Sequence, residues 1–347
     1  RTSDLYVTNA RQKTHTHTYM IKPKFLFFAA AVFLPILSFS EEPSDRKKEN
    51  PIKTIKRFID FNEKFSIRVF HNPSTFMTLS MIKNDESVEY KANHKGALGL
   101  GLSYNGFGLS AIVKKNKDCF KDEDEYGNTN YNDLTFSKYG KHIGAEFFFR
   151  RYSGMYIENY PSSLPQQGKK RNDIELTFIG CYINYTFFEE FSFNEILKQS
   201  ERRLGFSWSP LVGLYYDYFN FTSDGNLIPQ NNKNDFPEFL HISSSSYTGA
   251  GFFGGIGAKY CFSLKLYISG SASIGFGLGR LRTDIDDIKS KHASSSKTMI
   301  KLAIGFNGDS FGCGVIGSSE KSTYYINDTA SISPFANYIE FFILFRF

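Results

Sequence analysis

The most constraining feature of the sequence is the stretch at residues 96–113, GALGLGLSYNGFGLSAIV. Its centre holds Asn105-Gly106, the dipeptide with the strongest preference for a two-residue hairpin turn. Such a turn pairs the two flanking strands so that Leu98 lies opposite Val113 at their far end. One face of this hairpin is then almost wholly apolar, whereas the other carries Gly and Ser without charge or bulk. Lipid on one side and a narrow lumen on the other explain this contrast, so the pattern predicts a transmembrane β-barrel.

The beginning of the sequence predicts an export signal. A basic start is followed by an apolar run over residues 25–37, which ends in small residues. This is the layout of a secretory signal peptide, which we place at residues 20–40 with cleavage after Ser40. Residues 1–19 are then expected to be an upstream segment with no structural role.

A transmembrane anchor is the alternative interpretation of that apolar run. A spanning helix needs roughly 20 apolar residues, and this run is shorter and contains Pro35. No Cys stands at the cleavage point, which argues against a lipoprotein anchor. The charged and polar residues 41–60 predict a flexible periplasmic lead-in to the barrel.

The connections between the predicted strands are of two kinds. Short turns are expected around residues 105–106, 139–140, 261–263 and 307–310, and long polar loops near 115–131, 152–172, 222–246, 280–297 and 318–333. Short and long connections alternate along the chain, as a barrel with periplasmic turns and long external loops requires.

The strand count follows from the position of the two ends. Both must be periplasmic, so the number of strands must be even, and we count residues 61–83 as one long bent strand interrupted by Pro73. The only helix-like segment, at residues 193–203, must then lie on the periplasmic side. The prediction is an all-β, antiparallel up-and-down barrel of about twelve strands over residues 61–347. The pattern does not decide which face of the strand at residues 174–188 points outward.

The C-terminal strand is the strongest single indication of the compartment. The sequence ends in FFILFRF, and its apolar residues recur at every second position: Ile339, Phe341, Ile343, Phe345 and Phe347. A soluble protein with this ending would expose an adhesive edge strand. The pattern therefore predicts a strand that faces lipid and closes a barrel in the bacterial outer membrane.

Four stretches extend this interpretation to a family: GLGLSYNGFGLS, KHIGAEFFFRRYSGMYIENY, FSFNEILKQSERRLGFSWSPLVGLYYD and IGAKYCFSLKLYISGSASIGFG. With these motifs the chain resembles the bacterial outer-membrane barrels catalogued as domain of unknown function 4421, over roughly residues 61–347. The resemblance implies outer-membrane lipid as a partner. It also implies that the barrel-assembly machinery recognises the final strand through Phe347. It supplies no catalytic residues.

The cysteines and the charge exclude some classes of function. Cys119, Cys181, Cys261 and Cys313 show neither CxxC spacing nor a His at metal-ligand spacing. An exported chain could pair them in disulfides, and the sequence leaves this open, although Cys313 lies on an apolar face as a small hydrophobic residue would. The formal net charge of +6 is spread along the chain without a basic stripe, so no nucleic-acid partner is expected.

Two motifs have a functional and a structural interpretation. The glycines of Gly99-Leu-Gly101 and of residues 275–279 are spaced like those of nucleotide-binding loops, but they lie inside alternating strands and lead into no helix. The acidic residues 122–125 could hold Ca²⁺ in an external loop. They lack the Gly and the twelfth-position Glu of a dedicated calcium loop, so a solvated acidic loop is the preferred interpretation.

His142, Glu146 and Arg150 share the inner face of one predicted strand. At ~3.4 Å per residue, His142 and Glu146 are about 13 Å apart, so they form no direct pair, and lumen polarity explains them. The sequence thus predicts no catalytic, cofactor-binding or metal-binding residue and no enzyme. A channel or uptake pore for a small solute comes first among the functions that remain. A structural or adhesive surface barrel with a closed lumen is nearly level with it, and a membrane-embedded enzyme comes last.

Overall fold

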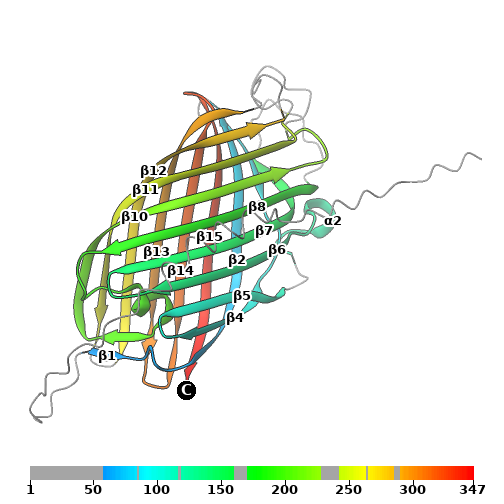
Figure 1. Ribbon diagram of the computed structural model, residues 1–347. Coiled ribbons are helices and arrows are strands. Elements are labelled where there is room, and N and C mark those ends of the chain that lie inside the picture. Colours follow the sequence, from blue (N-terminus) through cyan, green and yellow to red (C-terminus); the bar gives the residue numbers. More distant parts are fainter. Residues whose placement is uncertain are drawn as a thin grey trace, which may run out of the picture. The chain divides into compact units, whose positions relative to one another are not determined.

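The computed structural model describes residues 58–83, 86–115, 119–159, 170–227, 242–262, 265–284 and 290–347 (Figure 1). The N-terminal strands are β1 (Phe58–Asp60), β2 (Ser66–Lys83), β3 (Glu86–Lys91), β4 (Ala97–Tyr104), β5 (Phe107–Lys115), β6 (Asn130–Tyr139), β7 (Ile143–Asn159) and β8 (Lys170–Thr186). The C-terminal strands are β9 (Glu201–Arg203), β10 (Gly205–Thr222), β11 (Ser244–Cys261), β12 (Leu266–Thr283), β13 (Lys291–Asn307), β14 (Phe311–Tyr325) and β15 (Ala330–Arg346). Two short helices, α2 (Glu123–Tyr126) and η1 (Asn194–Lys198), complete the described elements.

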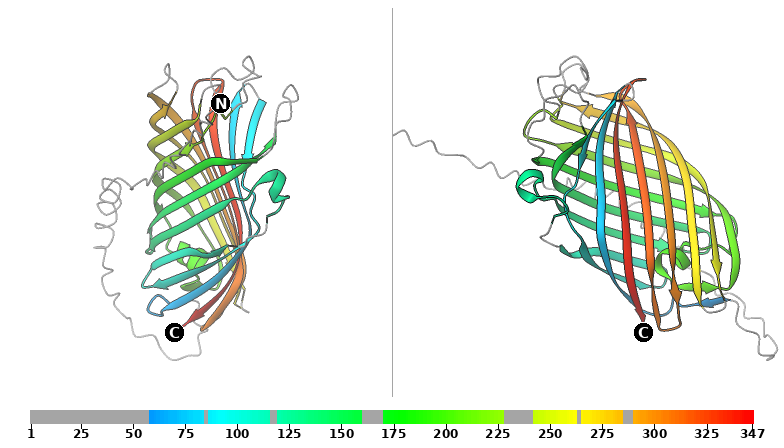
Figure 2. Two further views of the ribbon diagram at one scale, coloured as in Figure 1. Left: turned by 90° about the vertical axis from the view of Figure 1, so that its right-hand side faces the viewer. Right: turned by 180° about the vertical axis from the view of Figure 1, so that it is seen from behind.

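The large sheet is a closed antiparallel ring, as predicted. β15 pairs with β2 along nearly its whole length, and Figure 2 shows these two strands side by side. The ring has two ends, which we call the turn end and the loop end. The turn end carries the hairpin turn at residues 105–106, the turn at 308–310 and the C-terminal Phe347. The loop end carries the connections after β2, β7, β10 and β12.

The two ends of the ring differ in strand number. At the turn end β4, β5 and β6 stand between β2 and β7, so the ring contains twelve strands. At the loop end the single strand β3 takes their place, pairing with residues 78–83 of β2 and 156–159 of β7. Replacing three strands by one leaves ten. The predicted number of about twelve is therefore confirmed for the turn end, and β3 is a strand that the sequence did not predict.

The hairpin of β4 and β5 has the predicted turn and faces. Asn105 and Gly106 both have positive φ, at 47° and 72°, the conformation for which this dipeptide is selected. The leucines of β4 are exposed on the outer face while its glycines are buried. A bulge between Leu98 and Gly99 shifts the last pairs, so Leu98 lies opposite Lys114 and the predicted partner Val113 is wrong.

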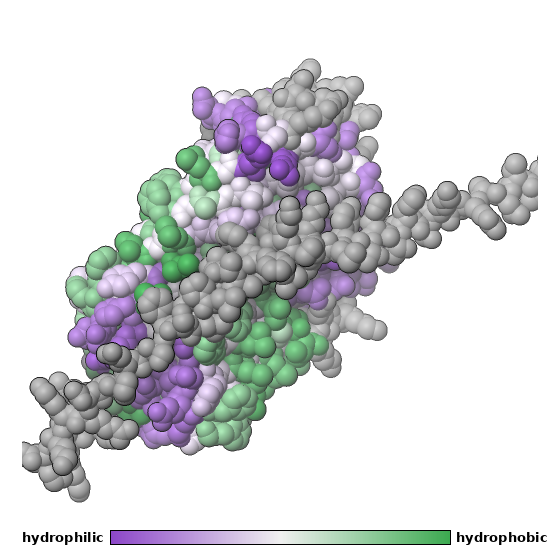
Figure 3. All heavy atoms as spheres, in the orientation of Figure 1, coloured by the Kyte–Doolittle hydropathy of each residue, from purple (hydrophilic) through white to green (hydrophobic). Residues whose placement is uncertain are grey.

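We call the parts of the barrel nearer the turn end and the loop end the turn half and the loop half. An apolar band covers the outer face of the turn half. Figure 3 shows this hydrophobic surface between hydrophilic ends. Aromatic side chains lie along its lower edge, at the turn end of β8, β10 and β11: Tyr185, Phe187, Phe188, Phe206, Trp208, Tyr260 and Phe262. Aromatic girdles of this kind mark the membrane interface of transmembrane barrels. Among the described residues, no helix is both long and apolar enough to cross a membrane.

The strands extend further toward the loop end than predicted. The predicted loop at 318–333 is mostly strand, because β14 runs to Tyr325 and β15 begins at Ala330. The predicted loops at 280–297 and 152–172 are shortened in the same way by β12, β13, β7 and β8. The loop predicted at 222–246 begins one residue before and ends three residues after the observed connection between β10 and β11.

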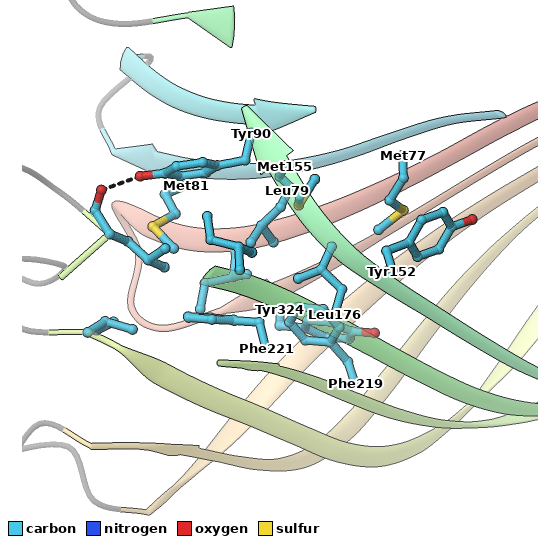
Figure 4. Packing of buried hydrophobic residues seen from close by; sticks show 14 of the residues in the cluster. Met77, Leu79, Met81, Tyr90, Tyr152, Met155, Leu176, Phe219, Phe221 and Tyr324 are labelled. Atoms are coloured by element: carbon cyan, nitrogen blue, oxygen red, sulfur yellow. Dashed lines mark hydrogen bonds between the residues drawn. The ribbon is translucent and has the colours of Figure 1, made fainter. Parts of the chain in front are cut away.

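The packing of the loop half explains these errors. Here the apolar side chains point inward and form one buried cluster (Figure 4). Within it, Tyr247 stacks on Tyr324 with ring centroids 4.1 Å apart. The Tyr90 hydroxyl donates to the Leu227 carbonyl at the edge of this cluster. Polar residues occupy the outer face, so the alternation is that of a soluble barrel. Strands with a polar outer face have no outward apolar stripe, so their sequences resemble those of polar loops. This is why the strand ends of the loop half were predicted as loops.

The predicted helix-like segment contains only one turn of helix. Residues 194–198 form a π-helix, η1, and residues 201–203 form β9, which pairs with β1 in a separate two-stranded sheet. The structure also shows which face of β8 points outward, which the sequence did not decide. Ile179, Cys181 and Ile183 face outward, and Tyr182 faces the lumen. The predicted upstream segment (1–19) and signal peptide (20–40) lie outside the described residues. So does the predicted lead-in (41–60), apart from its last three residues, which form β1.

Candidate functional site

The lumen contains a belt of buried charges, with Lys297 of β13 at its centre. The Lys297 side chain is 1% exposed, and its ammonium donates to Asp217 Oδ1 at 2.9 Å and to Glu320 Oε1 at 2.8 Å. It also donates to the Tyr182 hydroxyl at 2.8 Å, and that hydroxyl donates to Glu320. The sequence missed Lys297 because it lies inside a predicted polar loop.

Arg150 of β7 joins the belt from the opposite wall. Its Nη1 lies 3.1 Å from Glu320 Oε2 and its Nε 3.3 Å from Asp133 Oδ2, while the guanidinium stacks over the Phe148 ring at 4.2 Å. β7 and β14 are six positions apart in the ring of twelve, so the Arg150–Glu320 contact joins strands on opposite sides. The lumen is therefore crossed by side chains at this level.

A second ion pair of the belt links β7 to β13. Lys301 Nζ lies 3.1 Å from Glu146 Oε2, and the Tyr139 hydroxyl donates to the same oxygen at 2.7 Å. We use the name charged belt for the seven residues in these contacts: Asp133, Glu146, Arg150, Asp217, Lys297, Lys301 and Glu320. Two of the three inner-face residues singled out from the sequence, Glu146 and Arg150, thus belong to it.

The third, His142, does not. It lies near the turn end, where its ring contacts the Thr186 carbonyl at 2.8 Å and Glu189 Oε1 at 3.3 Å and stacks on Tyr185. The belt itself combines carboxylates, cations and phenols that are committed to one another. No group of His, Cys, Asp and Glu that could hold a metal ion is found in the described part of the chain.

A folded segment, which we call the plug, lies inside the lumen at the turn end. It consists of residues 187–204, the connection from β8 to β10, and it buries Phe191, Phe193 and Ile196 inside the barrel. Gly257 of β11 makes room for the Phe191 ring, since a Cβ atom there would lie 2.1 Å from its Cζ.

Polar contacts fix the plug to the barrel wall and to the turn after β13. Glu195 of η1 forms an ion pair with Lys259 of β11, and both side chains are almost fully buried. Arg202 donates to the Asn307 carbonyl at 2.7 Å and to Asp309 Oδ1 at 2.8 Å, and Lys265 contacts Asp309 Oδ2 at 2.9 Å. The hydrogen bond from Lys265 lowers the pKa of Asp309, with partial burial opposing it and Arg202 reinforcing it.

The final strand also holds the plug. Arg346, the penultimate residue, points inward and donates to the carbonyl groups of Gln199 and Gly308. The Phe347 backbone N–H donates to the Phe65 carbonyl at 2.9 Å, next to the start of β2. Strand closure and plug attachment are therefore both completed by the last two residues.

A cavity of about 110 Å³ remains between the plug and the charged belt. Its wall on one side is formed by the small residues of β4, β5 and β6, and on the other by charged and aromatic side chains.

The remaining motifs have structural roles. The Asp122 carboxylate accepts hydrogen bonds from the backbone N–H groups of Asp124 and Glu125, so it caps α2. Gly99 faces the Phe70 ring, where a Cβ would lie 2.0 Å from Cζ. Of the cysteines, Cys181 and Cys313 lie on the outer face and Cys261 is buried toward the lumen; these three form no disulfide within the described residues.

A family model described as a domain of unknown function, DUF4421, matches residues 56–347. The chain belongs to this family. The resemblance noted from the sequence is thereby confirmed. No curated protein matches the sequence.

Several solved outer-membrane barrels are similar in structure. The outer membrane protease OmpT from Escherichia coli is 7% identical, with 83% of this chain and 98% of that chain covered and a TM-score of 0.38. The COG4313 outer membrane channel from Pseudomonas putida F1 is 10% identical, with 89% and 100% covered and a TM-score of 0.35. A FadL homologue of Pseudomonas aeruginosa is 9% identical, with 82% and 90% covered and a TM-score of 0.27. None of these scores supports an inference about activity.

Proposed function

We propose that this family member is a bacterial outer-membrane barrel whose lumen is closed and whose loop half forms a folded extension above the membrane. The apolar band with its aromatic lower edge supports lipid contact around the turn half. The inward-facing cluster and polar outer face support exposure of the loop half to water.

The observation that carries the closed lumen is the contact between Arg150 and Glu320. These residues come from strands on opposite sides of the ring, and their side chains meet at 3.1 Å. An open pore would have water between these walls. The belt also commits its charged groups to one another, so the proposal includes no enzymatic activity.

Liposome swelling tests the proposal. Vesicles carrying the refolded barrel should swell in an isotonic small sugar no faster than empty vesicles, whereas an open porin reconstituted in parallel should give rapid swelling. Swelling that increases with the amount of barrel would refute a closed lumen.

A gated uptake pore is the second candidate, and the plug is the observation that favours it. Residues 187–204 are one continuous segment, held by polar contacts and by buried apolar side chains at a single end of the lumen. A variant without residues 189–203 should still keep the charged belt. If the belt alone closes the lumen, this variant stays closed to sugar, and if the plug is a gate, it swells.

A further inference from the structure

The cavity between the plug and the charged belt has an unusual charge arrangement. Four cationic side chains line it, and three of them contact a carboxylate. Arg68 lies 3.3 Å from Glu340, Lys301 lies 3.1 Å from Glu146, and Arg150 lies 3.3 Å from Asp133. The fourth cation is Lys198 of η1.

Lys198 has only neutral partners. It is 7% exposed, and its ammonium donates to the Gly106 carbonyl and to the Ser137 carbonyl, the latter at 3.4 Å. No carboxylate of the described residues lies within 4.0 Å of its Nζ. A buried ammonium without a counter-ion is unfavourable, so it either loses its proton or acquires an anion.

The rest of the cavity provides space and hydroxyl groups. Ser110, Ser137, Tyr139 and Tyr338 line it, and Gly108 approaches Lys198 so closely that a Cβ would lie 2.7 Å from Cε. A cavity of about 150 Å³ accommodates the six carbons of benzene, so about 110 Å³ suits an anion of roughly four heavy atoms.

Two neighbouring strands of the barrel wall, β5 and β6, separate beside this cavity. β5 and β6 pair only from Phe107 opposite Lys138 to Ala111 opposite Leu134. Beyond that point β5 stays with β4, and β6 stays with β7. The first residues past the division, Ile112 and Asp133, both line the cavity, so the cavity lies where these two strands separate.

We propose that this cavity binds a small monovalent carboxylate, with Lys198 as its counter-ion and the hydroxyls of Ser110, Ser137 and Tyr338 as hydrogen-bond donors. The site is distinct from the closed-lumen function, because it needs no passage along the barrel axis.

Calorimetric titration of the refolded barrel in detergent with sodium acetate tests the proposal, at constant ionic strength set with sodium chloride. The wild type should bind one acetate saturably. Inorganic phosphate, which is larger and carries more charge, should not compete. Lys198→Met should weaken acetate binding by about tenfold or more, because a charge-assisted hydrogen bond is lost. Lys141→Met, which removes an exposed lysine at the turn after β6, should bind like the wild type.

A second variant keeps the test valid if Lys198→Met does not fold. Ser110→Val leaves Lys198 in place and fills the cavity from the wall, so it should also lose acetate binding. An absence of saturable binding to the wild type would overturn the proposal, as would equal binding by the wild type and Lys198→Met. Neither result depends on whether the lumen conducts in a bilayer.

Discussion

Replacing Lys297 by Met removes the central cation of the charged belt at nearly constant side-chain length. Removing one partner from a buried ion pair costs about 3–5 kcal/mol, because the other charge is left buried without compensation. Here Glu320 keeps Arg150 at 3.1 Å, so only Asp217 loses its counter-ion. We therefore expect the free energy of unfolding to fall by about 3 kcal/mol, the lower end of that range.

Urea unfolding in lipid vesicles measures this loss, followed through the fluorescence of Trp208, the single tryptophan, which lies on the outer face. Lys321→Met is the matched control: Lys321 is exposed on β14 next to Glu320 and should cost less than about 0.5 kcal/mol. Adding Asp217→Asn to Lys297→Met removes the uncompensated charge and should restore about 1 kcal/mol or more. If Lys297→Met costs no more than the control, or the double variant is no more stable than the single one, the belt is not the buried network described above.

Three further perturbations test other parts of the structure. Leu100→Arg places a charge on the outer face and should destabilise the barrel in vesicles by about 2–4 kcal/mol if it lies near the midplane, whereas Gly101→Ser on the inner face should cost far less; equal losses would contradict the assigned faces. Asp309 has a lowered pKa, so its stabilisation of the plug is present at neutral pH and is lost as the pH falls below its ordinary value of 3.8; Asp309→Asn should cost no more than about 1 kcal/mol at pH 7, and a stability profile below pH 4 as steep as that of the wild type would contradict this assignment. Deleting Phe347 should leave refolding into detergent and the heat-dependent gel shift intact but impair insertion in cells; normal insertion would contradict recognition of the final residue by the assembly machinery.

The turn half of the fold could be predicted because its apolar outer face follows a simple rule. Leu98, Leu100 and Leu102 alternate with Gly and Ser, so one short stretch determines the faces of the hairpin. The Asn-Gly turn fixes the register as far as Gly99, beyond which the bulge shifts the pairing of Leu98. The same rule fails in the loop half, where Tyr247, Tyr324 and their neighbours point inward and polar residues point outward. A strand with that pattern has no apolar band to distinguish it from a polar loop.

The charged belt was only half predictable for a related reason. Glu146 and Arg150 alternate with apolar residues inside an obvious strand, so their inward direction could be inferred. Lys297 lies in the stretch KHASSSKTMIK, and its position on the same face as Ser295 and Met299 is the one signal that could have identified it. Its partner Glu320 lies on the neighbouring strand β14, whereas Asp217 lies on β10, three positions away in the ring. One sequence carries no direct record of such contacts.

Conductance in a planar lipid bilayer tests the closed lumen most directly. The charged belt, the plug and the apolar cluster of the loop half each fill the lumen at a different level, so the wild-type barrel should insert at neutral pH without stepwise current. An open porin added under the same conditions confirms that insertion is detected. Stable, ohmic conductance steps from the wild-type chain would show that the opposite walls do not meet at Arg150 and Glu320, and the closed-lumen account would be wrong.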